Sequence, residues 1–215
     1  MKKCLAALLV LALALVLALA LGLAACAQKG GTTEDDGETL PETPIRLDAL
    51  RVEFTKGERN ADDLLALKEA LPPLLIAALG EKNVEVGRVD ITFGASAEAT
   101  ALALAEGGID VAFLPLLSLF SCEEGAYRLA LVQAADGESA IEEREAVAIT
   151  QENKAVTSDG FRAALRGAVE ALCADEEGSA ALSLYEAAPD YRAAEMSDFA
   201  SERAAYEKES PGAIN

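Results

Sequence analysis

The sequence predicts an α/β fold built on a parallel sheet, and two observations lead to this prediction. Along residues 50–114, stretches with a strand-like pattern alternate with stretches of helical periodicity, in the order strand, helix, strand, helix, strand. Each helical stretch starts at a capping residue and ends at a glycine, so its boundaries are marked. Two successive strand–helix–strand units with right-handed crossovers place their three strands in one parallel sheet.

The first unit begins with a strand and continues into a long helix. Residues Leu50–Thr55 (LRVEFT) alternate apolar and polar side chains, which is the pattern of a half-buried strand. Asn60 is a good N-cap for an amphipathic helix over Ala61–Leu79, and Gly80 ends it. We expect Pro72–Pro73 to kink or divide this helix, because proline lacks the N–H and clashes with the preceding turn.

The second unit repeats this order with a shorter helix. Residues Val84–Phe93 predict a second strand, and Ser96 caps a helix that runs to Glu106 and ends at Gly107–Gly108. Residues Ile109–Leu114 (IDVAFL) form a short apolar run of the kind found in buried parallel strands. The predicted parallel core therefore holds three strands.

The rest of the chain adds strands and then helices. Residues Tyr127–Gln133 and Glu145–Thr150 have the pattern of two further strands. Three helices are expected after them, at Ser158–Cys173, Glu176–Glu186 and Ser197–Lys208. We place one folded domain over residues 47–210 and a tail over residues 211–215.

The N-terminus has the layout of an exported lipoprotein. Two lysines precede an uncharged run, Cys4–Ala25, which is mostly Leu and Ala and reads as a secretory signal peptide over residues 1–25. The run is also long enough to span a bilayer, so a retained anchor is the alternative. Its end, Leu23-Ala24-Ala25-Cys26, resembles the lipobox of bacterial lipoproteins. We therefore expect an extracytoplasmic protein held on the cell membrane through lipidated Cys26.

A linker is expected between this anchor and the domain. Residues 26–46 are rich in Gly, Thr, Glu, Asp and Pro and hold few apolar side chains. Such a segment buries too little apolar surface to fold, so it serves as a flexible acidic tether.

Composition excludes several function classes. The net charge is −19, and removing residues 1–25 takes away two lysines and no acid, leaving 16 basic against 37 acidic residues, or −21. Nucleic-acid binding depends on Lys and Arg neutralising phosphates, so it is not expected. The chain has no His, which excludes a Ser-His-Asp triad and a His-ligated zinc site. We expect no enzyme, no metal site and no cofactor.

Cys122 and Cys173 either pair as a disulfide or are two small buried residues.

Three blocks resemble the phosphate, phosphite and phosphonate-binding proteins of ABC importers. The most informative is ITFGASAEATALALAEGGIDVAFLP at Ile91–Pro115, with a strand, a small loop, a helix ending on glycine and a strand "DVAFL-P". The opening unit, LRVEFTKGERNADDLLALKEAL at Leu50–Leu71, and the ending FRAALRGAVEALCADEEGSAALSLY at Phe161–Tyr185 also fit. The ending carries "D-x-E-G" at Asp175–Gly178.

The resemblance implies a type II periplasmic-binding-protein-like fold, a permease partner and a small anionic ligand. In this family hydroxyls and backbone N–H groups at helix N-termini bind the phosphorus group between two lobes. The matching positions are Thr55 and Lys56 after the first strand, Ser96 at the second helix, and Pro115 and Ser118 after the third strand. All of them follow carboxyl ends of parallel strands, where open α/β sheets bind ligands.

The sequence also departs from the family. Ala97 replaces a tyrosine that the family commonly carries, and the "LGP" turn reads Leu114–Pro115 without its glycine. Only about 37 residues, Ser121–Thr157, are left for a second lobe, whereas one βαβ unit takes about 30 residues. We therefore expect a single parallel-sheet lobe whose second lobe is absent or vestigial, with weak ligand affinity or none. The alternative is a one-lobe surface lipoprotein that binds another protein through its open sheet edge or a pocket.

Each predicted site residue also has a plainer interpretation. Ser96 is either a ligand contact or simply the cap of its helix. Thr55 and Lys56 are either part of the site or an ordinary solvated turn, although Lys56 is the cation that follows the first strand.

Two acidic features receive structural interpretations. The cluster Glu142, Glu143 and Glu145 lacks the spacing and the glycine of a calcium-binding loop, so we interpret it as a solvated charge run. Asp110 lies inside an apolar strand, and we expect it to accept backbone N–H bonds at the strand edge without a catalytic role.

Overall fold

The computed structural model describes residues 39–123, 125–134, 141 and 144–209. All of these belong to one compact unit, Glu38–Asn215. The predicted signal peptide, the lipidation residue Cys26, most of the predicted linker and the tail lie outside the described residues. Among the described residues, no helix combines the length and the apolar character that a bilayer crossing requires.

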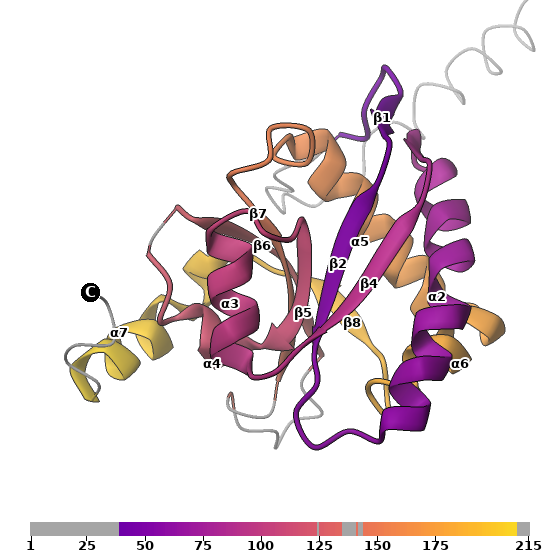
Figure 1. Cartoon of the computed structure of the whole chain (residues 1–215). Helices are drawn as coiled ribbons and strands as arrows, with labels where there is room; N and C mark the ends of the chain where they lie inside the picture. The colour runs from indigo at the N-terminus through magenta and orange to yellow at the C-terminus, as the bar shows by residue number, and fades with distance from the viewer. Residues whose placement is uncertain (1–38, 124, 135–140, 142–143, 210–215) are drawn as a thin grey trace, which may run out of the picture. The chain divides into compact units, whose positions relative to one another are not determined.

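A six-stranded sheet in the order β4-β2-β5-β7-β6-β8 forms the centre of the unit, and β1 and β3 form a separate two-stranded sheet (Figure 1). The strands are β1 Ile45–Leu47, β2 Leu50–Thr55, β3 Val84–Val86, β4 Val89–Gly94, β5 Val111–Pro115, β6 Tyr127–Gln133, β7 Glu145–Thr150 and β8 Tyr191–Ala193. The helices are α2 Ala61–Gly80, α3 Ala97–Ala105, α4 Leu116–Leu119, α5 Asp159–Ala174, α6 Glu176–Leu182, the 3₁₀ helix η2 Met196–Phe199 and α7 Ala200–Glu209.

The three strands predicted to be parallel are parallel. β2 lies between β4 and β5, and Phe54 stands opposite Phe93 on one side and Phe113 on the other. The helices α2 and α3 make the two crossovers between these strands. The predicted α/β class with a parallel core is therefore confirmed.

The strand pair after residue 121 enlarges this sheet and builds no second lobe within the described residues. β7 pairs antiparallel with β5 on one side and with β6 on the other. All six residues of β7 are buried, because its two faces are covered by different helices. The fold matches a single lobe, as the short Ser121–Thr157 segment predicts.

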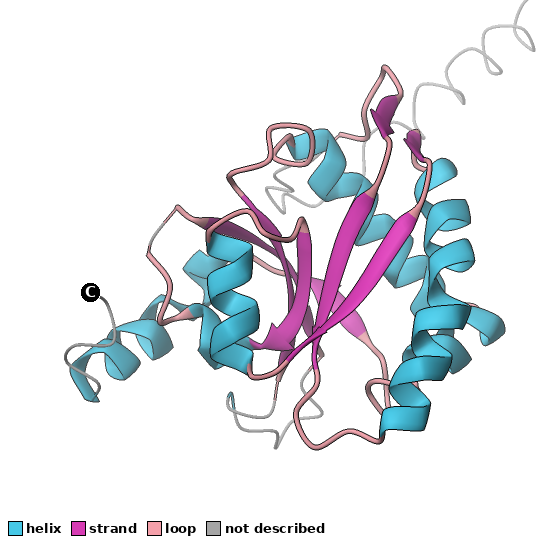
Figure 2. Cartoon of the chain, viewed as in Figure 1, coloured by secondary structure: helices cyan, strands magenta, loops and turns pink. Residues whose placement is uncertain are grey.

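Helices cover both faces of the sheet (Figure 2). The larger core lies between the sheet and α2, α5 and α6, and the smaller core lies under α3 and α4. Cys173 packs against the larger core, whereas Cys122 belongs to the smaller one. Both cysteines are free, so the disulfide alternative is wrong.

The prediction that prolines divide the first helix is also wrong. α2 runs without interruption from Ala61 to Gly80 with Pro72 and Pro73 inside it. Both prolines lie away from the buried face, which holds leucines at positions 64, 67, 71 and 75. The carbonyls that lose a backbone donor belong to Lys68 and Glu69, which are exposed and can be hydrated. Packing of the leucine face therefore outweighs the local cost of the prolines.

The predicted strand Val84–Phe93 is two strands, β3 and β4. The break falls at Gly87, whose N–H donates to the carbonyl of Leu47 at 2.8 Å. A Cβ on Gly87 would lie 2.7 Å from the backbone oxygen of Asp48, so only glycine allows this approach. β1, which pairs with β3, begins at Ile45 and was not predicted.

Side-chain caps fix the starts of α2, α3 and α5 close to the predicted bounds. Asn60, Ser96 and Ser158 each accept a hydrogen bond from a first-turn backbone N–H of their helix. α6 ends at Leu182, four residues earlier than predicted, and the last predicted helix is divided into η2 and α7. The short elements α4 and β8 were not predicted, since three or four residues show no usable periodicity.

Asp110 has the predicted structural role. Its carboxylate accepts the backbone N–H of Arg51 at 2.8 Å, the Arg51 guanidinium at 2.7 Å and the Asn153 amide at 2.6 Å. Burial alone would raise the pKa of Asp110, but these hydrogen bonds hold that pKa below its usual value. The residue therefore ties β2, β5 and the loop after β7 together.

Candidate functional site

The carboxyl ends of β2 and β4 meet at one edge of the sheet. Thr55 stands opposite Gly94 in the register, and the N–H of Lys56 donates to the carbonyl of Gly94 at 3.0 Å. Ser96 follows two residues later and begins α3. The structure thus brings Thr55, Lys56 and Ser96 to one corner of the sheet.

Two buried hydroxyl groups line this corner without a partner. Thr55 is 4% exposed and Thr100 is fully buried, and neither Oγ1 has a hydrogen-bond partner among the described residues. A Cβ on Gly94 would lie 1.9 Å from the Thr100 Oγ1 and 2.7 Å from the Glu53 Oε1. Gly94 therefore lets a hydroxyl and a carboxylate approach the strand closely. A buried hydroxyl without a partner costs about 1–3 kcal/mol, so the two threonines make this corner energetically costly.

A carboxylate of the chain itself already occupies the start of α3. The Ser96 Oγ accepts the N–H of Ala99 at 3.2 Å. The pKa of Glu98 is lowered because its carboxylate accepts hydrogen bonds from its own backbone N–H and from the Ser96 hydroxyl. Ser96 is therefore the N-cap of α3, which was the simpler of its two interpretations. An incoming anion would compete with Glu98 for the same donors.

The other two predicted residues lie further along the chain. Pro115 is half-buried at the end of β5 and stands opposite Glu145 of β7. Ser118 is half-buried on α4, and its backbone carbonyl accepts the Ser121 hydroxyl at 2.8 Å. No hydrogen bond among the described residues joins Ser118 to Lys56.

A buried charged cluster at the same edge was not predicted. The Arg59 Nη2 lies 2.6 Å from the Glu145 Oε1, and the Arg59 Nε donates to the carbonyl of Tyr185 at 2.8 Å. The guanidinium also stacks 3.8 Å above the centre of the Tyr185 ring. The Tyr185 hydroxyl is 3.2 Å from both the Glu145 Oε2 and the carbonyl of Phe113. This cluster links the loop after β2 to β5, β7 and the end of α6.

The interpretation of the acidic cluster as a solvated charge run is wrong for Glu145. Its side chain is buried, and burial raises its pKa although Arg59 opposes that shift. Glu142 and Glu143 lie outside the described residues. One signal could have identified Glu145, since it opens an otherwise apolar strand that is predicted to be buried.

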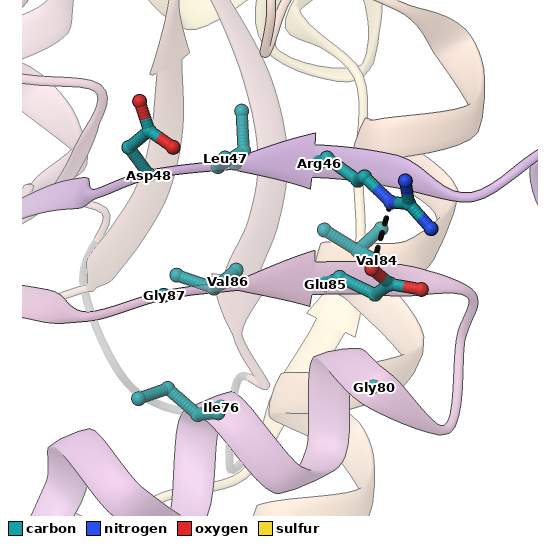
Figure 3. Close-up of a pocket in the computed structure, with 9 residues that line it drawn as sticks. All are labelled: Arg46, Leu47, Asp48, Ile76, Gly80, Val84, Glu85, Val86 and Gly87. Atoms are coloured by element: carbon teal, nitrogen blue, oxygen red, sulfur yellow. Dashed lines mark hydrogen bonds and ion pairs between the residues drawn. The ribbon is translucent and has the colours of Figure 1, made fainter.

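A shallow hollow of about 430 Å³ lies at the other end of the strands, beside β1 and β3 (Figure 3). It is lined by Arg46, Leu47, Asp48, Ile76, Gly80, Val84, Glu85, Val86 and Gly87. Its only ion pair joins Arg46 and Glu85 at 2.8 Å, and both side chains are more than half exposed. The hollow lacks buried polar groups that converge on one point, so we place the candidate ligand site at the carboxyl-end edge.

Comparisons with known proteins concern the fold. No protein-family model matches the sequence, and no curated protein matches it. XAC2383 from Xanthomonas citri is similar in structure, with 8% sequence identity. Bound to ATP it gives a TM-score of 0.51 over 78% of this chain and 100% of that chain. The chloride-bound structure of XAC2383 gives a TM-score of 0.50 over 75% of this chain and 98% of that chain.

PhnD1 from Prochlorococcus marinus (MIT 9301), in complex with methylphosphonate, gives a TM-score of 0.47 at 8% identity, over 75% of this chain and 98% of that chain. Such low identities carry no residue-by-residue correspondence. The likeness to XAC2383 shows that the two chains share an α/β fold.

Proposed function

We propose that the protein is a lipid-anchored, extracytoplasmic ligand-binding protein related to the solute-binding components of ABC importers and reduced to one lobe. Its ligand is a small anion of the phosphate or phosphonate class. The observation that carries the proposal is the corner where the carboxyl ends of β2 and β4 bring Lys56 and the start of α3 together. The Thr55 and Thr100 hydroxyls of these elements are buried and have no hydrogen-bond partner among the described residues. XAC2383 has been solved with ATP and with chloride, both of them anions, which supports an anionic ligand here.

The corner is suited to binding without catalysis. It offers hydroxyl, ammonium and backbone donors, and the chain has no His to act as a general base there. The buried acid and phenol at the same sheet edge, Glu145 and Tyr185, are engaged with each other and with Arg59. An importer component needs no chemistry beyond recognition, so this donor set is sufficient for the proposed role.

The expected affinity is low for two physical reasons. Because a single lobe leaves the ligand partly exposed to water, each hydrogen bond contributes only about 0.5–1.5 kcal/mol to binding. The carboxylates of Glu53 and Glu98 also lie at the corner and repel an anion. Lys56, which is exposed, supplies the opposing charge. We therefore expect a dissociation constant in the millimolar range, which corresponds to a binding free energy of roughly −4 kcal/mol.

Removing the negative charge of Glu98, which competes with an anion for the donors at the start of α3, should strengthen anion binding. We expect Glu98→Gln to raise the affinity for phosphate or methylphosphonate about three- to tenfold, because the donors at the start of α3 lose their own carboxylate. Ser96→Ala should lower the affinity. The measurement is isothermal titration calorimetry of the chain from Ala27 onward, which contains the whole compact unit.

The matched control is Glu106→Gln, which makes the same charge change at the other end of α3. It should leave the affinity nearly unchanged, so an equal gain would indicate only a change in net charge. Micromolar binding by the unaltered chain would contradict the one-lobe proposal. Millimolar binding that neither Ser96→Ala nor Glu98→Gln alters would place the anion elsewhere.

The membrane anchor has its own test. Cys26→Ser should abolish incorporation of a fatty-acid analogue in cells, because the thiol of that residue takes the lipid in a lipobox. Cys4→Ser is the control, since Cys4 lies in the segment that is cleaved off, and its labelling should equal that of the unaltered chain. Labelling that persists in Cys26→Ser would disprove lipidation at this residue.

A further inference from the structure

The central sheet has one long open edge. β4 pairs with β2 on one side only, and β3 precedes it along the same edge. The opposite edge strand, β8, has only three residues. Figure 1 shows α2 alongside β4, with no described helix or strand in front of it. The outward N–H and C=O groups of such a strand are a template for pairing with another strand.

An apolar stripe of α2 runs beside this edge. Leu65, Pro72 and Ile76 recur at helical spacing on one flank of α2, next to its buried leucine face. Leu65 is 58% exposed, which is unusual for so large an apolar side chain. Ile76 lines the hollow together with Val84 and Val86 of β3 (Figure 3). The stripe therefore lies on the side of α2 that faces β3 and β4.

The rim of this groove is acidic. Asp62 and Glu69 neighbour the apolar stripe on the outer side of α2, and both are exposed. Glu85 of β3 is exposed as well, but it is paired with Arg46 at 2.8 Å, so the unpaired negative charge of the rim comes from α2. The whole chain carries a net charge of −19. A basic partner is attracted to this surface, whereas a second copy of the chain is repelled.

We infer that this groove, formed by the open edge of β4 and by Leu65, Pro72 and Ile76 of α2, binds an extended segment of a partner protein in which apolar and basic residues alternate. The segment adds to the sheet as a seventh strand. Its backbone pairs with β4, and its alternate apolar side chains pack on the α2 stripe. Its basic side chains meet the acidic rim. This site adjoins the proposed anion site, because β4 ends at Gly94, but it does not depend on it.

A synthetic peptide tests the inference directly. The probe is a blocked peptide of alternating lysine and valine, as long as β4, with a fluorophore, and its binding to the chain from Ala27 onward is followed by fluorescence anisotropy. We expect saturable binding that weakens about tenfold in Leu65→Ser, because a half-exposed leucine would become buried under the added strand. Leu102→Ser is the matched control, since Leu102 is 56% exposed on α3, and it should bind the peptide as tightly as the unaltered chain.

The backbone requirement separates strand addition from mere charge attraction. The same peptide with N-methyl groups on alternate residues keeps its charge but cannot pair with β4, and it should not bind saturably. Equal binding of the methylated peptide, equal weakening by Leu102→Ser, or no binding of the first peptide would each overturn the inference. A dimer in sedimentation equilibrium that Leu65→Ser dissociates would assign the groove to a second copy instead and would also overturn it.

Discussion

Phe113→Ala is expected to lower the free energy of unfolding by about 3–5 kcal/mol, because it removes a large apolar side chain from the middle of the sheet. Phe113 is 1% exposed and stacks on Phe54 with ring centres 4.3 Å apart. The rings of Tyr185 and Tyr191 lie nearly perpendicular to it, with ring centres 6.5 Å and 5.9 Å away. Set against a total stability of about 5–15 kcal/mol, this loss is large.

Urea denaturation followed by circular dichroism measures the loss. Phe93→Ala is the control, since Phe93 also contacts Phe54, with tilted rings whose centres are 6.4 Å apart, but lies half-buried on the edge strand β4. We expect a clearly smaller loss for Phe93→Ala. Equal losses for the two variants would contradict the central position of β5.

Arg59→Ala is expected to destabilise the protein by about 3–5 kcal/mol at pH 7, because it leaves the Glu145 carboxylate buried without its counter-ion. The Arg59 side chain is 22% exposed and that of Glu145 is 6% exposed, so water screens the pair little. The variant also loses the hydrogen bond to the carbonyl of Tyr185 and the stacking on its ring.

The dependence of this loss on pH follows from the raised pKa of Glu145. Burial raises that pKa in the folded protein, and removal of Arg59 raises it further. A carboxyl group with a raised folded pKa favours folding most when it is protonated, below its unfolded pKa of about 4.3. This contribution is lost as the pH rises through the folded pKa. The deficit of Arg59→Ala relative to the unaltered chain should therefore shrink as the pH falls from 7 toward 4.5.

Two further variants make this result specific. Glu145→Gln in the Arg59→Ala background should remove the pH dependence and recover much of the stability, because no charge is then buried. Arg88→Ala, which breaks the exposed pair between Arg88 and Asp90, should cost far less than Arg59→Ala, because water screens an exposed ion pair. A deficit of Arg59→Ala that is the same at pH 7 and pH 4.5 would contradict the role of Glu145.

Much of the fold could be predicted because local rules govern it. The bounds of β2, β6 and β7 match the predicted ranges, since alternation and apolar runs reflect which faces are buried. The caps at Asn60 and Ser96 were identified because a capping side chain bonds to a backbone N–H only two or three residues away. Local rules failed where packing outweighed them, as at the prolines of α2.

The candidate site could be predicted only in part. Thr55, Lys56 and Ser96 meet because the carboxyl ends of neighbouring parallel strands share an edge, which is a property of topology that the order of elements implies. Arg59 and Glu145 stand 86 positions apart in the chain. Their contact depends on β7 entering the sheet beside β5, and no local pattern encodes that pairing.

The sequence by itself determined the class of fold, the helix caps, the parallel core and the lack of residues for a second lobe, because each depends on spacing or on the number of residues available. The tertiary structure alone decided where β7 docks, which carboxylate is buried and which sheet edge stays open beside the flank of α2. These features depend on which surfaces meet in space, and many pairings of distant segments satisfy the same local pattern. Only the packing of the whole core selects one of them.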